Sequence, residues 1–360
     1  MISKSPHIVV VGAGIVGASL AYHLVRKNAR VTLIDKAPNS ASGATEKSFA
    51  WITVTHDAPE TYISLRQQAI ADWHRVEDEL KGQLNVDWSG ALTWREDPAE
   101  TVRMAGKLIN SGYQVHLVDQ QQIRLLEPNL KIVPAQAILA ENEGAIDARL
   151  TTELLITAAR QAGADCQLGN EVLSLMTNGS RITGVITANG KITADTVVLA
   201  AGVNTTTLCQ PLDVTLPINI SPAILIAFHT PHQFVNRIIS NPFMDIRAAS
   251  ATLTLSAAEY TDESIENNPQ AIAQRSLEQL KAHWQGAGQI NVTNVMIGKR
   301  PIPQDGLPII GRTPHIEGLY VSVMHAGVTL AAVAGRLAAG EILSDQDDFL
   351  LSSYRPSRFN

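Results

Sequence analysis

The hydrophobic residues at the start of the chain follow first the pattern of a buried strand and then that of a helix. Residues 7–11 read His-Ile-Val-Val-Val, and a short β-branched run that ends at a glycine is typical of a central parallel strand. Residues 14–28 predict a helix with small residues on one face, and residues 30–35 predict a strand that ends in an acid. A strand, a glycine turn, a helix and a second strand together form a βαβ unit.

The centre of the chain predicts a mixture of helices and short strands. A polar, amphipathic helix is expected over 63–81, where apolar residues recur at helical spacing. The other predicted elements are a strand at 114–118, helices at 120–126 and 151–164, a three-stranded meander at 172–176, 182–187 and 191–193, and a buried strand at 196–202. The Asn-Gly pairs at 178–179 and 189–190 favour the tight turns of such a meander.

Residues 211–299 have a different pattern. Long alternating runs at 218–229 and 249–256 surround a predicted helix at 268–285, which indicates an antiparallel sheet in a second layer or domain. Beyond this segment the chain returns to a buried strand at 319–324 and an Ala-rich helix at 328–343.

The elements together predict an α/β fold, α+β overall, with a Rossmann-like nucleotide domain and a second, mostly antiparallel-sheet substrate domain. The two ends and the centre of the chain are expected to build the nucleotide domain. The expected boundaries are 1–85, 143–210 and 300–360 for the nucleotide domain, and 86–142 and 211–299 for the substrate domain.

Composition narrows the class of protein. The chain has 360 residues, of which 45% are hydrophobic and 17% charged, so it can fill a large core and is not a disordered chain or a disulfide miniprotein. A formal net charge of −6 argues against nucleic-acid binding. Two distant cysteines, Cys166 and Cys209, fit a reducing compartment. His229 and His232 flank Pro231 in a predicted strand-to-loop segment, so we expect no metal site.

One apolar run, residues 8–25, resembles an export signal in length. Tyr22 and His23 interrupt it, and its three glycines stand at fixed offsets that a signal peptide does not need. No other stretch approaches the ~20 apolar residues of a membrane span. We therefore expect a cytoplasmic protein, with peripheral membrane association left open.

The sequence Gly12-Ala-Gly-Ile-Val-Gly17 lies between the first strand and the first helix. The first glycine of such a motif permits the tight turn, the second lets a pyrophosphate approach the backbone, and the third lets the helix pack on the strand. Unpaired N–H groups at the helix N-terminus attract the anion. Asp35, which closes the next strand, can accept a hydrogen bond from a ribose hydroxyl. In this structural context the motif predicts dinucleotide binding.

Three later blocks accompany this motif. They are Leu126-Glu-Pro with Glu143-Gly-Ala-Ile-Asp147 and the helix after it, Val197-Val-Leu-Ala-Ala-Gly202, and Gly298-Lys-Arg-Pro-Ile-Pro-Gln-Asp-Gly-Leu-Pro-Ile-Ile-Gly311 with Met324-His-Ala-Gly-Val-Thr329. In this order, over nearly the whole chain, the blocks resemble the D-amino acid oxidase, glycine oxidase and sarcosine oxidase family of FAD-dependent oxidoreductases. The resemblance implies that the nucleotide domain binds FAD. It also implies a non-covalent flavin, since neither cysteine lies in the C-terminal third, where some relatives attach it.

The resemblance assigns the FAD contacts to particular residues. Ser42-Gly-Ala-Thr45 would lie along the pyrophosphate and flavin, although residues 46–49 depart from the family's pattern. Gly327-Val-Thr329 would direct N–H groups and a hydroxyl at the pyrimidine edge, where negative charge builds on reduction. The implied cofactor-binding residues are Gly12, Ala13, Gly14, Ile15, Val16, Gly17, Asp35, Lys36, Ser42, Gly43, Ala44, Thr45, Val172, Ala201, Gly202, Gly327, Val328 and Thr329.

Arg300 is the first candidate for the substrate. In the resembling family an arginine at this position grips the substrate carboxylate, and a planar guanidinium suits such bidentate binding. The alternative is an arginine that pairs a surface acid or the flavin itself. His325 is a second candidate catalytic residue, through contact with the isoalloxazine. The further candidates for the substrate pocket are His56, Asp57, Tyr62, Tyr260 and Trp51.

The resemblance implies an enzyme that acts on CH–NH or CH–NH2 groups. FAD would take a hydride from a small amine or amino acid of the glycine, sarcosine or D-amino acid type, and the resulting imine would hydrolyse. One alternative is an FAD-dependent 2-hydroxy acid dehydrogenase, which needs a histidine such as His56 or His325 as base. Another is a flavoprotein subunit that needs a partner. The sequence leaves open the electron acceptor, oxygen or a quinone or electron-transfer partner, and the oligomeric state.

Overall fold

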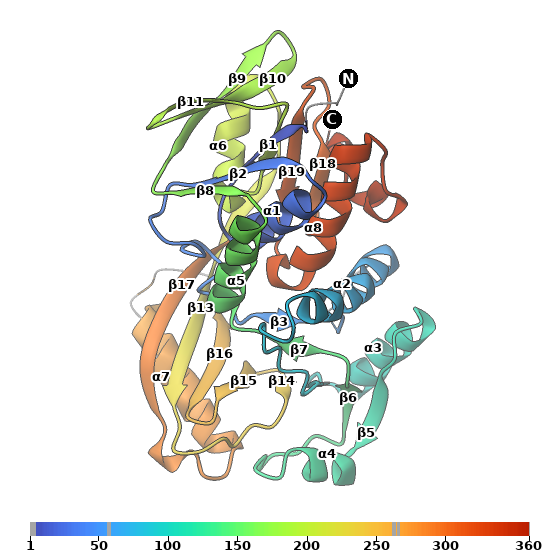
Figure 1. Ribbon diagram of the computed structural model, residues 1–360. Helices are drawn as coiled ribbons and strands as arrows, with labels where there is room; N and C mark the ends of the chain where they lie inside the picture. The colour runs from blue at the N-terminus through green and yellow to red at the C-terminus, as the bar shows by residue number, and fades with distance from the viewer. Residues whose placement is uncertain (1–4, 56–58, 261–263, 265–266, 360) are drawn as a thin grey trace.

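Two large sheets lie at opposite ends of an elongated molecule in the computed structural model, which describes residues 5–55, 59–260, 264 and 267–359 (Figure 1). The first and the last described segments of the chain both lie at the first sheet, although hundreds of residues separate them in sequence (Figure 1).

The first sheet is six-stranded and mostly parallel. From edge to edge its strands are β18 (Ile309–Arg312), β19 (Leu319–Val323), β12 (Thr196–Leu199), β1 (His7–Val11), β2 (Arg30–Asp35) and β8 (Asp165–Leu168). Antiparallel pairing joins β18 to β19, and the other neighbours are parallel. All five residues of β1 are buried, because the sheet is covered on both faces.

Helices pack on one face of this sheet. They are α1 (Ile15–Arg26), α5 (Ala148–Gln161) and α8 (Gly327–Ser344), with α2 (Glu60–Glu79) packed against α8. Gly335 lets α8 approach α1, because a Cβ at this position would collide with the side chain of Ser19. Contrary to the expectation that no stretch besides residues 8–25 approaches a membrane span, α8 is long and apolar enough to cross a membrane by length and composition, although 67% of it is buried within this fold.

The second sheet is eight-stranded. From edge to edge its strands are β17 (Asn291–Pro303), β13 (Ile218–His229), β16 (Leu253–Glu259), β15 (Asp245–Ser250), β14 (Ile238–Ser240), β4 (Ala91–Thr93), β6 (Gln136–Ala140) and β5 (His116–Asp119). The described pairs are antiparallel except for β14 with β4. Ile226 and Phe228 of β13 join the core that covers α7 (Pro269–His283), whereas Ala223 and Leu225 line a cavity on the other face.

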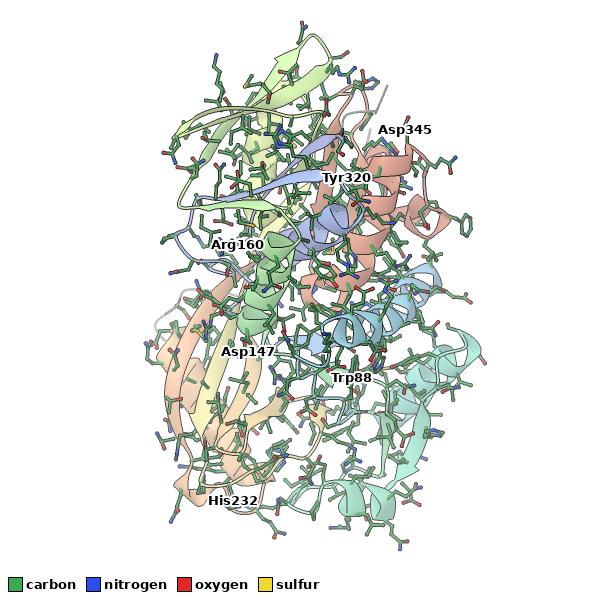
Figure 2. The ribbon with its side chains drawn as sticks, viewed as in Figure 1. Trp88, Asp147, Arg160, His232, Tyr320 and Asp345 are labelled. Carbon is green, nitrogen blue, oxygen red and sulfur yellow. The ribbon has the colours of Figure 1, made fainter. Side chains whose placement is uncertain are left out.

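Smaller elements complete the fold. They are the three-stranded sheet β11 (Gly190–Thr193), β10 (Arg181–Thr187) and β9 (Val172–Asn178), the pair β3 (Trp51–Ile52) and β7 (Gly144–Ala145), the helices α3 (Pro98–Asn110), α4 (Gln120–Leu126) and α6 (Thr205–Cys209), and 3-10 helices at 202–204, 210–212, 287–289, 349–354 and 356–359. Figure 2 shows Asp147 at the start of α5 and Arg160 near its end, where each charge opposes the helix dipole.

The predicted fold class is confirmed, since a Rossmann-like parallel sheet lies beside a mostly antiparallel one. The prediction of one strand over 249–256 is wrong. The chain turns there, with β15 ending at Ser250 and β16 beginning at Leu253. The alternation at this point involves small and hydroxyl residues that are exposed, so it marks no continuous buried face. Strand β17 runs through residue 300, where we placed a boundary between domains, and the division stays a prediction.

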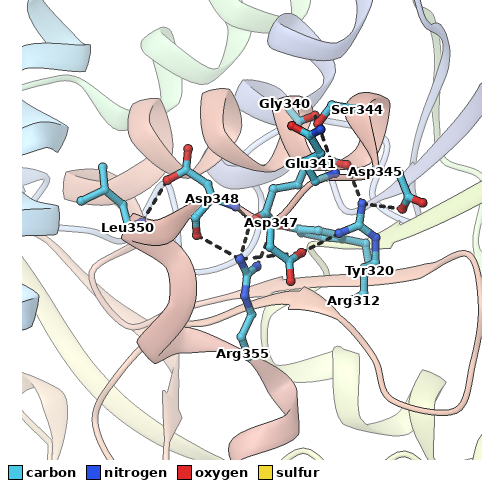
Figure 3. Close-up of polar contacts among 11 residues, drawn as sticks. Arg312, Tyr320, Gly340, Glu341, Ser344, Asp345, Asp347, Asp348, Leu350 and Arg355 are labelled. Carbon is cyan, nitrogen blue, oxygen red and sulfur yellow. Dashed lines mark hydrogen bonds and ion pairs between the residues drawn. The ribbon is translucent and has the colours of Figure 1, made fainter.

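A buried ionic cluster fixes the C-terminal segment to α8 (Figure 3). The Glu341 side chain is 1% exposed, accepts bonds from both terminal nitrogens of Arg355, and accepts a third from the Tyr320 hydroxyl at 2.6 Å. The Asp348 N–H donates to the same carboxylate. Hydrogen bonds from Arg355 and Tyr320 keep the pKa of Glu341 below its usual value despite its burial.

We predict that Glu341→Gln lowers the free energy of unfolding by about 3–5 kcal/mol, because Arg355 then loses its buried anionic partner. Glu317→Gln is the matched control, since its pair with Arg181 is exposed on both sides (67% and 58%) and should contribute about 1 kcal/mol or less. Urea unfolding followed by circular dichroism measures both. Equal losses in the two variants would contradict the assigned role of the cluster.

Candidate functional site

A cavity of about 730 Å³ runs between the two sheets. One end lies at the carboxyl ends of β1 and β2, where parallel sheets usually bind their ligands. The other end lies against the face of the eight-stranded sheet, at β13, β16 and β17. An extended molecule with a nucleotide at one end and a reactive ring at the other matches this shape.

The glycine motif forms the turn into α1. Gly12 has φ +109°, and a Cβ there would collide with the Ala200 carbonyl. A Cβ at Gly17 would collide with the Gly12 carbonyl, so the third glycine lets the helix pack on the strand. A Cβ at Gly14 would stand 3.1 Å from Thr45 Oγ1 and project where the cavity passes the helix N-terminus. Backbone can therefore face a ligand closely at this turn.

Asp35 holds the same turn from the next strand. Its carboxylate accepts the Ala13 N–H at 2.6 Å and the Ala37 N–H at 2.8 Å. Helix α1 starts without a side-chain cap and without an acid in its first turn. The positive end of α1 therefore faces the cavity, with Asp35 beside it in a position to accept from a ribose hydroxyl.

The structure brings most of the predicted cofactor residues to this cavity. Those lining it are Gly12, Gly14, Ile15, Val16, Asp35, Lys36, Ser42, Gly43, Ala44, Thr45, Val172, Ala201, Gly202, Gly327, Val328 and Thr329. Ala13 and Gly17 lie behind the turn and shape it. The Thr45 hydroxyl accepts the Ile15 N–H at 3.2 Å, which ties the small-residue loop to the start of α1. These residues fit FAD: the N-terminus of α1 would hold the pyrophosphate, and the part of the cavity toward the second sheet would take the flavin.

The start of α8 lies further along the cavity. Its N-cap, Ala326, offers no side chain to the helix N–H groups. The Thr329 hydroxyl, which we expected to face the flavin, instead donates to the Trp51 carbonyl at 2.9 Å and accepts the Thr53 N–H at 3.4 Å. The Thr329 hydroxyl therefore ties the segment at 51–53 to α8. The backbone N–H groups in the first turn of α8 are the donors that remain for a ligand.

Arg300 lies in the cavity, but it already holds a carboxylate. Its terminal nitrogens donate to Glu259 at 3.1 and 2.7 Å, and one also donates to Ser221 Oγ at 2.8 Å. The alternative expectation, an arginine that pairs a surface acid, describes this geometry, since the Glu259 side chain is 68% exposed. The Arg300 hydrogen bonds lower the pKa of Glu259, so this carboxylate stays ionised, and His325 adds to the effect.

The register of the second sheet explains the pair. Ser221 lies opposite Arg300, and Ala223 lies opposite both Gly298 and Glu259, so all these residues share one face. On the same face Asp245 lies opposite Ala257. The cavity floor is thus made largely of small residues, with the Arg300 guanidinium and two carboxylates around them, and Arg95 lines the cavity as well.

Asp245 is the second acid of the floor. Burial raises its pKa, while a bond from Ser240 and the charge of Arg95 lower it. Asp245 and Glu259 are diagonal neighbours on adjacent strands. Residues at such positions are about 7–8 Å apart. Neither acid was predicted from the sequence. The available signal was an acid at each end of the alternating stretch that became the β15–β16 hairpin.

The other residues predicted for catalysis or for the substrate pocket lie in different parts of the structure. Trp51 and His325 line the cavity. Tyr260 packs against the core beneath the second sheet, and Tyr62 is buried on α2, where its ring lies 6.0 Å from that of Tyr354. His56 and Asp57 lie outside the described residues.

The two histidines considered for a metal lie away from this cavity. Figure 2 shows His232 at the outer end of the second sheet. Within residues 5–55, 59–260, 264 and 267–359, no group of three or more His, Cys, Asp or Glu side chains is arranged to hold a metal ion.

Comparisons with known proteins agree with this geometry. The family model described as "FAD dependent oxidoreductase" matches residues 7–341. A D-amino acid dehydrogenase from Allorhizobium ampelinum is 25% identical, with 98% of this chain and 99% of the relative covered. A glycine oxidase from Pseudomonas aeruginosa is also 25% identical, with coverage of 96% and 97%. The crystal structure of glycine oxidase from Geobacillus kaustophilus superposes with a TM-score of 0.88 at 20% identity, covering 98% and 99%, and shares the fold.

We predict that Gly14→Val gives a colourless protein. A larger side chain would press on Thr45 and fill the space that the pyrophosphate needs at the start of α1. Gly106→Val is the matched control, because a Cβ at Gly106 meets nothing within 4 Å. Absorbance of the purified proteins in the flavin band measures the outcome, and circular dichroism reports folding. A folded, yellow Gly14→Val variant with wild-type FAD affinity would refute the assignment.

Proposed function

This chain belongs to the family of FAD-dependent oxidoreductases, and from this premise we propose that it oxidises a small amino acid at the carbon that carries the nitrogen. FAD supplies the hydride acceptor when bound, and the chain's residues bind and orient the substrate. The relatives named D-amino acid dehydrogenase and glycine oxidase support this class of substrate.

The observation that carries the proposal is the charge pattern on the cavity floor. An amino acid zwitterion presents one anion and one cation a short distance apart. The floor offers a guanidinium, Arg300, beside two carboxylates, Glu259 and Asp245. Small residues between them, such as Ala223 and Gly298, leave space for a ligand. The floor therefore complements a zwitterion in both charges.

The Arg300–Glu259 pair has to open for this binding mode. The Arg300 side chain is 22% exposed and is held by Ser221, whereas the Glu259 side chain is 68% exposed. Glu259 is thus the partner that is free to move. A substrate carboxylate that takes the place of Glu259 on Arg300 carries the same charge as Glu259. The Glu259 and Asp245 carboxylates are then left to face the substrate ammonium. Arg300 would then orient the α-carbon, which is a positioning effect.

The first test is anaerobic reduction of the flavin in the purified holoprotein. Glycine, sarcosine, D- and L-amino acids and 2-hydroxy acids are added separately while the flavin absorbance is followed. We expect one or more of the amino acids to bleach it, and readmitted air then shows whether oxygen accepts the electrons. Bleaching by hydroxy acids alone would refute the proposal in favour of a hydroxy acid dehydrogenase. A flavin that no amine reduces without a second protein would favour the partner-dependent subunit.

The second test is Arg300→Met. We expect KM for a carboxylate-bearing substrate to rise about 10- to 150-fold, because a charge-assisted pair contributes roughly 1.5–3 kcal/mol. Flavin content should stay unchanged. Arg149→Met is the control for loss of one positive charge, since Arg149 is exposed on α5 and pairs with Glu153. Unchanged kinetics of Arg300→Met on a confirmed substrate would remove Arg300 from the substrate site.

A further inference from the structure

Arg66 is a buried guanidinium that also lines the cavity. It lies on α2, is 3% exposed, and no carboxylate in the described part of the chain lies within ion-pair distance of it. Its one described hydrogen bond, to the Thr53 carbonyl, is long at 3.5 Å. Its Nε has no hydrogen-bond partner among the described residues, and its guanidinium lies 4.5 Å from the centre of the Tyr62 ring.

Other arginines in this fold show what Arg66 lacks. Arg355 pairs with Glu341, Arg336 pairs with Asp72, and the buried Arg247 donates to three backbone carbonyls. An isolated charge in a protein interior is costly unless it is paired and hydrogen-bonded. Because Arg66 lines the cavity, a ligand there with an anionic or carbonyl edge would supply the partner that its guanidinium lacks.

The neighbours of Arg66 place it next to the N-terminus of α8. Thr53 joins the two, since its carbonyl accepts from Arg66 and its N–H donates to the Thr329 hydroxyl. Two turns further along α2, Trp73 donates from Nε1 to the Val328 and Thr329 carbonyls at 3.0 Å. One side of α2 therefore packs along the first turn of α8 and carries Arg66 to the same wall of the cavity.

Two sources of positive potential meet at this wall. The N-terminus of α8, an 18-residue helix, carries no side-chain cap and no acid in its first turn. The second source is Arg66, which forms no ion pair with any residue that the structure describes. We infer that Arg66 and the N-terminus of α8 form one anion-binding site, and that Arg66 stabilises the negative charge on the pyrimidine edge of the flavin when FAD is reduced. The inference rests on FAD binding and not on the identity of the substrate.

The charge balance explains why such a site matters. A hydride carries two electrons and one proton, so its transfer to a neutral flavin leaves one net negative charge on the ring system. Positive groups near the pyrimidine edge favour that product and so raise the reduction potential. Arg66 would then determine how readily the flavin accepts a hydride, without touching the substrate.

The test compares Arg66→Gln with Arg66→Lys in the holoprotein. Gln keeps a polar group for the Thr53 carbonyl and removes the charge, whereas Lys keeps the charge. Two readouts need no substrate: the two-electron midpoint potential, measured against a reference dye, and the dissociation constant for sulfite, an anion that adds to oxidised flavin. We expect Gln to weaken sulfite binding about tenfold or more, and a tenfold change in a two-electron equilibrium corresponds to about 30 mV. Lys should restore most of both values.

Arg75→Gln is the matched control, because Arg75 lies on α2, is 38% exposed and pairs with Asp72 and Glu79. It should leave the potential and the sulfite affinity at their wild-type values. A folded, yellow Arg66→Gln variant with a wild-type potential would overturn the inference. A raised KM for carboxylate substrates at an unchanged potential would also overturn it, since the anion would then be the substrate. An equal change in potential and sulfite affinity in Arg75→Gln would overturn it too, because the effect would then follow from the loss of any positive charge on α2.

Discussion

The packing of α1 against α8 is the contact on which the rest of the site depends. Gly335 allows the two helices to touch, and the Ser19 hydroxyl of α1 donates to the Ala331 carbonyl of α8 at 2.6 Å. Both helices begin at the cavity, one after the glycine turn and the other at Gly327. Because their axes are fixed together, their positive ends are held at a constant separation, as the binding of an extended dinucleotide requires.

A second constraint positions the segment between β3 and α2. Glu143 is fully buried and accepts the Val54 and Thr55 N–H groups at 2.6 and 2.7 Å and the Thr55 hydroxyl at 3.0 Å. Burial raises the pKa of Glu143 while these donors oppose the shift. A carboxylate bound in this way holds the backbone in a single conformation, and Thr53 is thereby placed between Arg66 and α8. The acid of the Glu143-Gly-Ala-Ile-Asp147 block thus serves the cavity without lining it.

Local patterns in the sequence were enough to find the nucleotide half of the site. The turn at Gly12, the acid at Asp35 and the start of α8 are all set by neighbouring residues, so motif and periodicity predict them. The Arg300–Glu259 pair is different. Those residues are 41 positions apart, and they meet through the register that β13 sets with β16 and β17. A strand pattern states which face a residue occupies relative to its own strand, but not which residue of another strand lies opposite. The sequence therefore left open whether Arg300 pairs an acid, and only the fold identifies Glu259 as its partner.

The sequence predicts the role of Arg66 only in part. On the helical pattern of α2 it belongs to the buried side with Tyr62, Ala69 and Trp73, and a charged residue in such a stripe is itself a signal. The signal indicates that something must compensate the charge, but not what it is, since a buried arginine usually finds a carboxylate inside the protein. Arg300 found one in Glu259, whereas Arg66 found none in the described chain and instead faces the cavity beside a helix N-terminus. Arg300 and Arg66 thus differ in their partners: Arg300 has an internal acid that a substrate can replace, whereas Arg66 awaits a ligand that the protein alone does not supply.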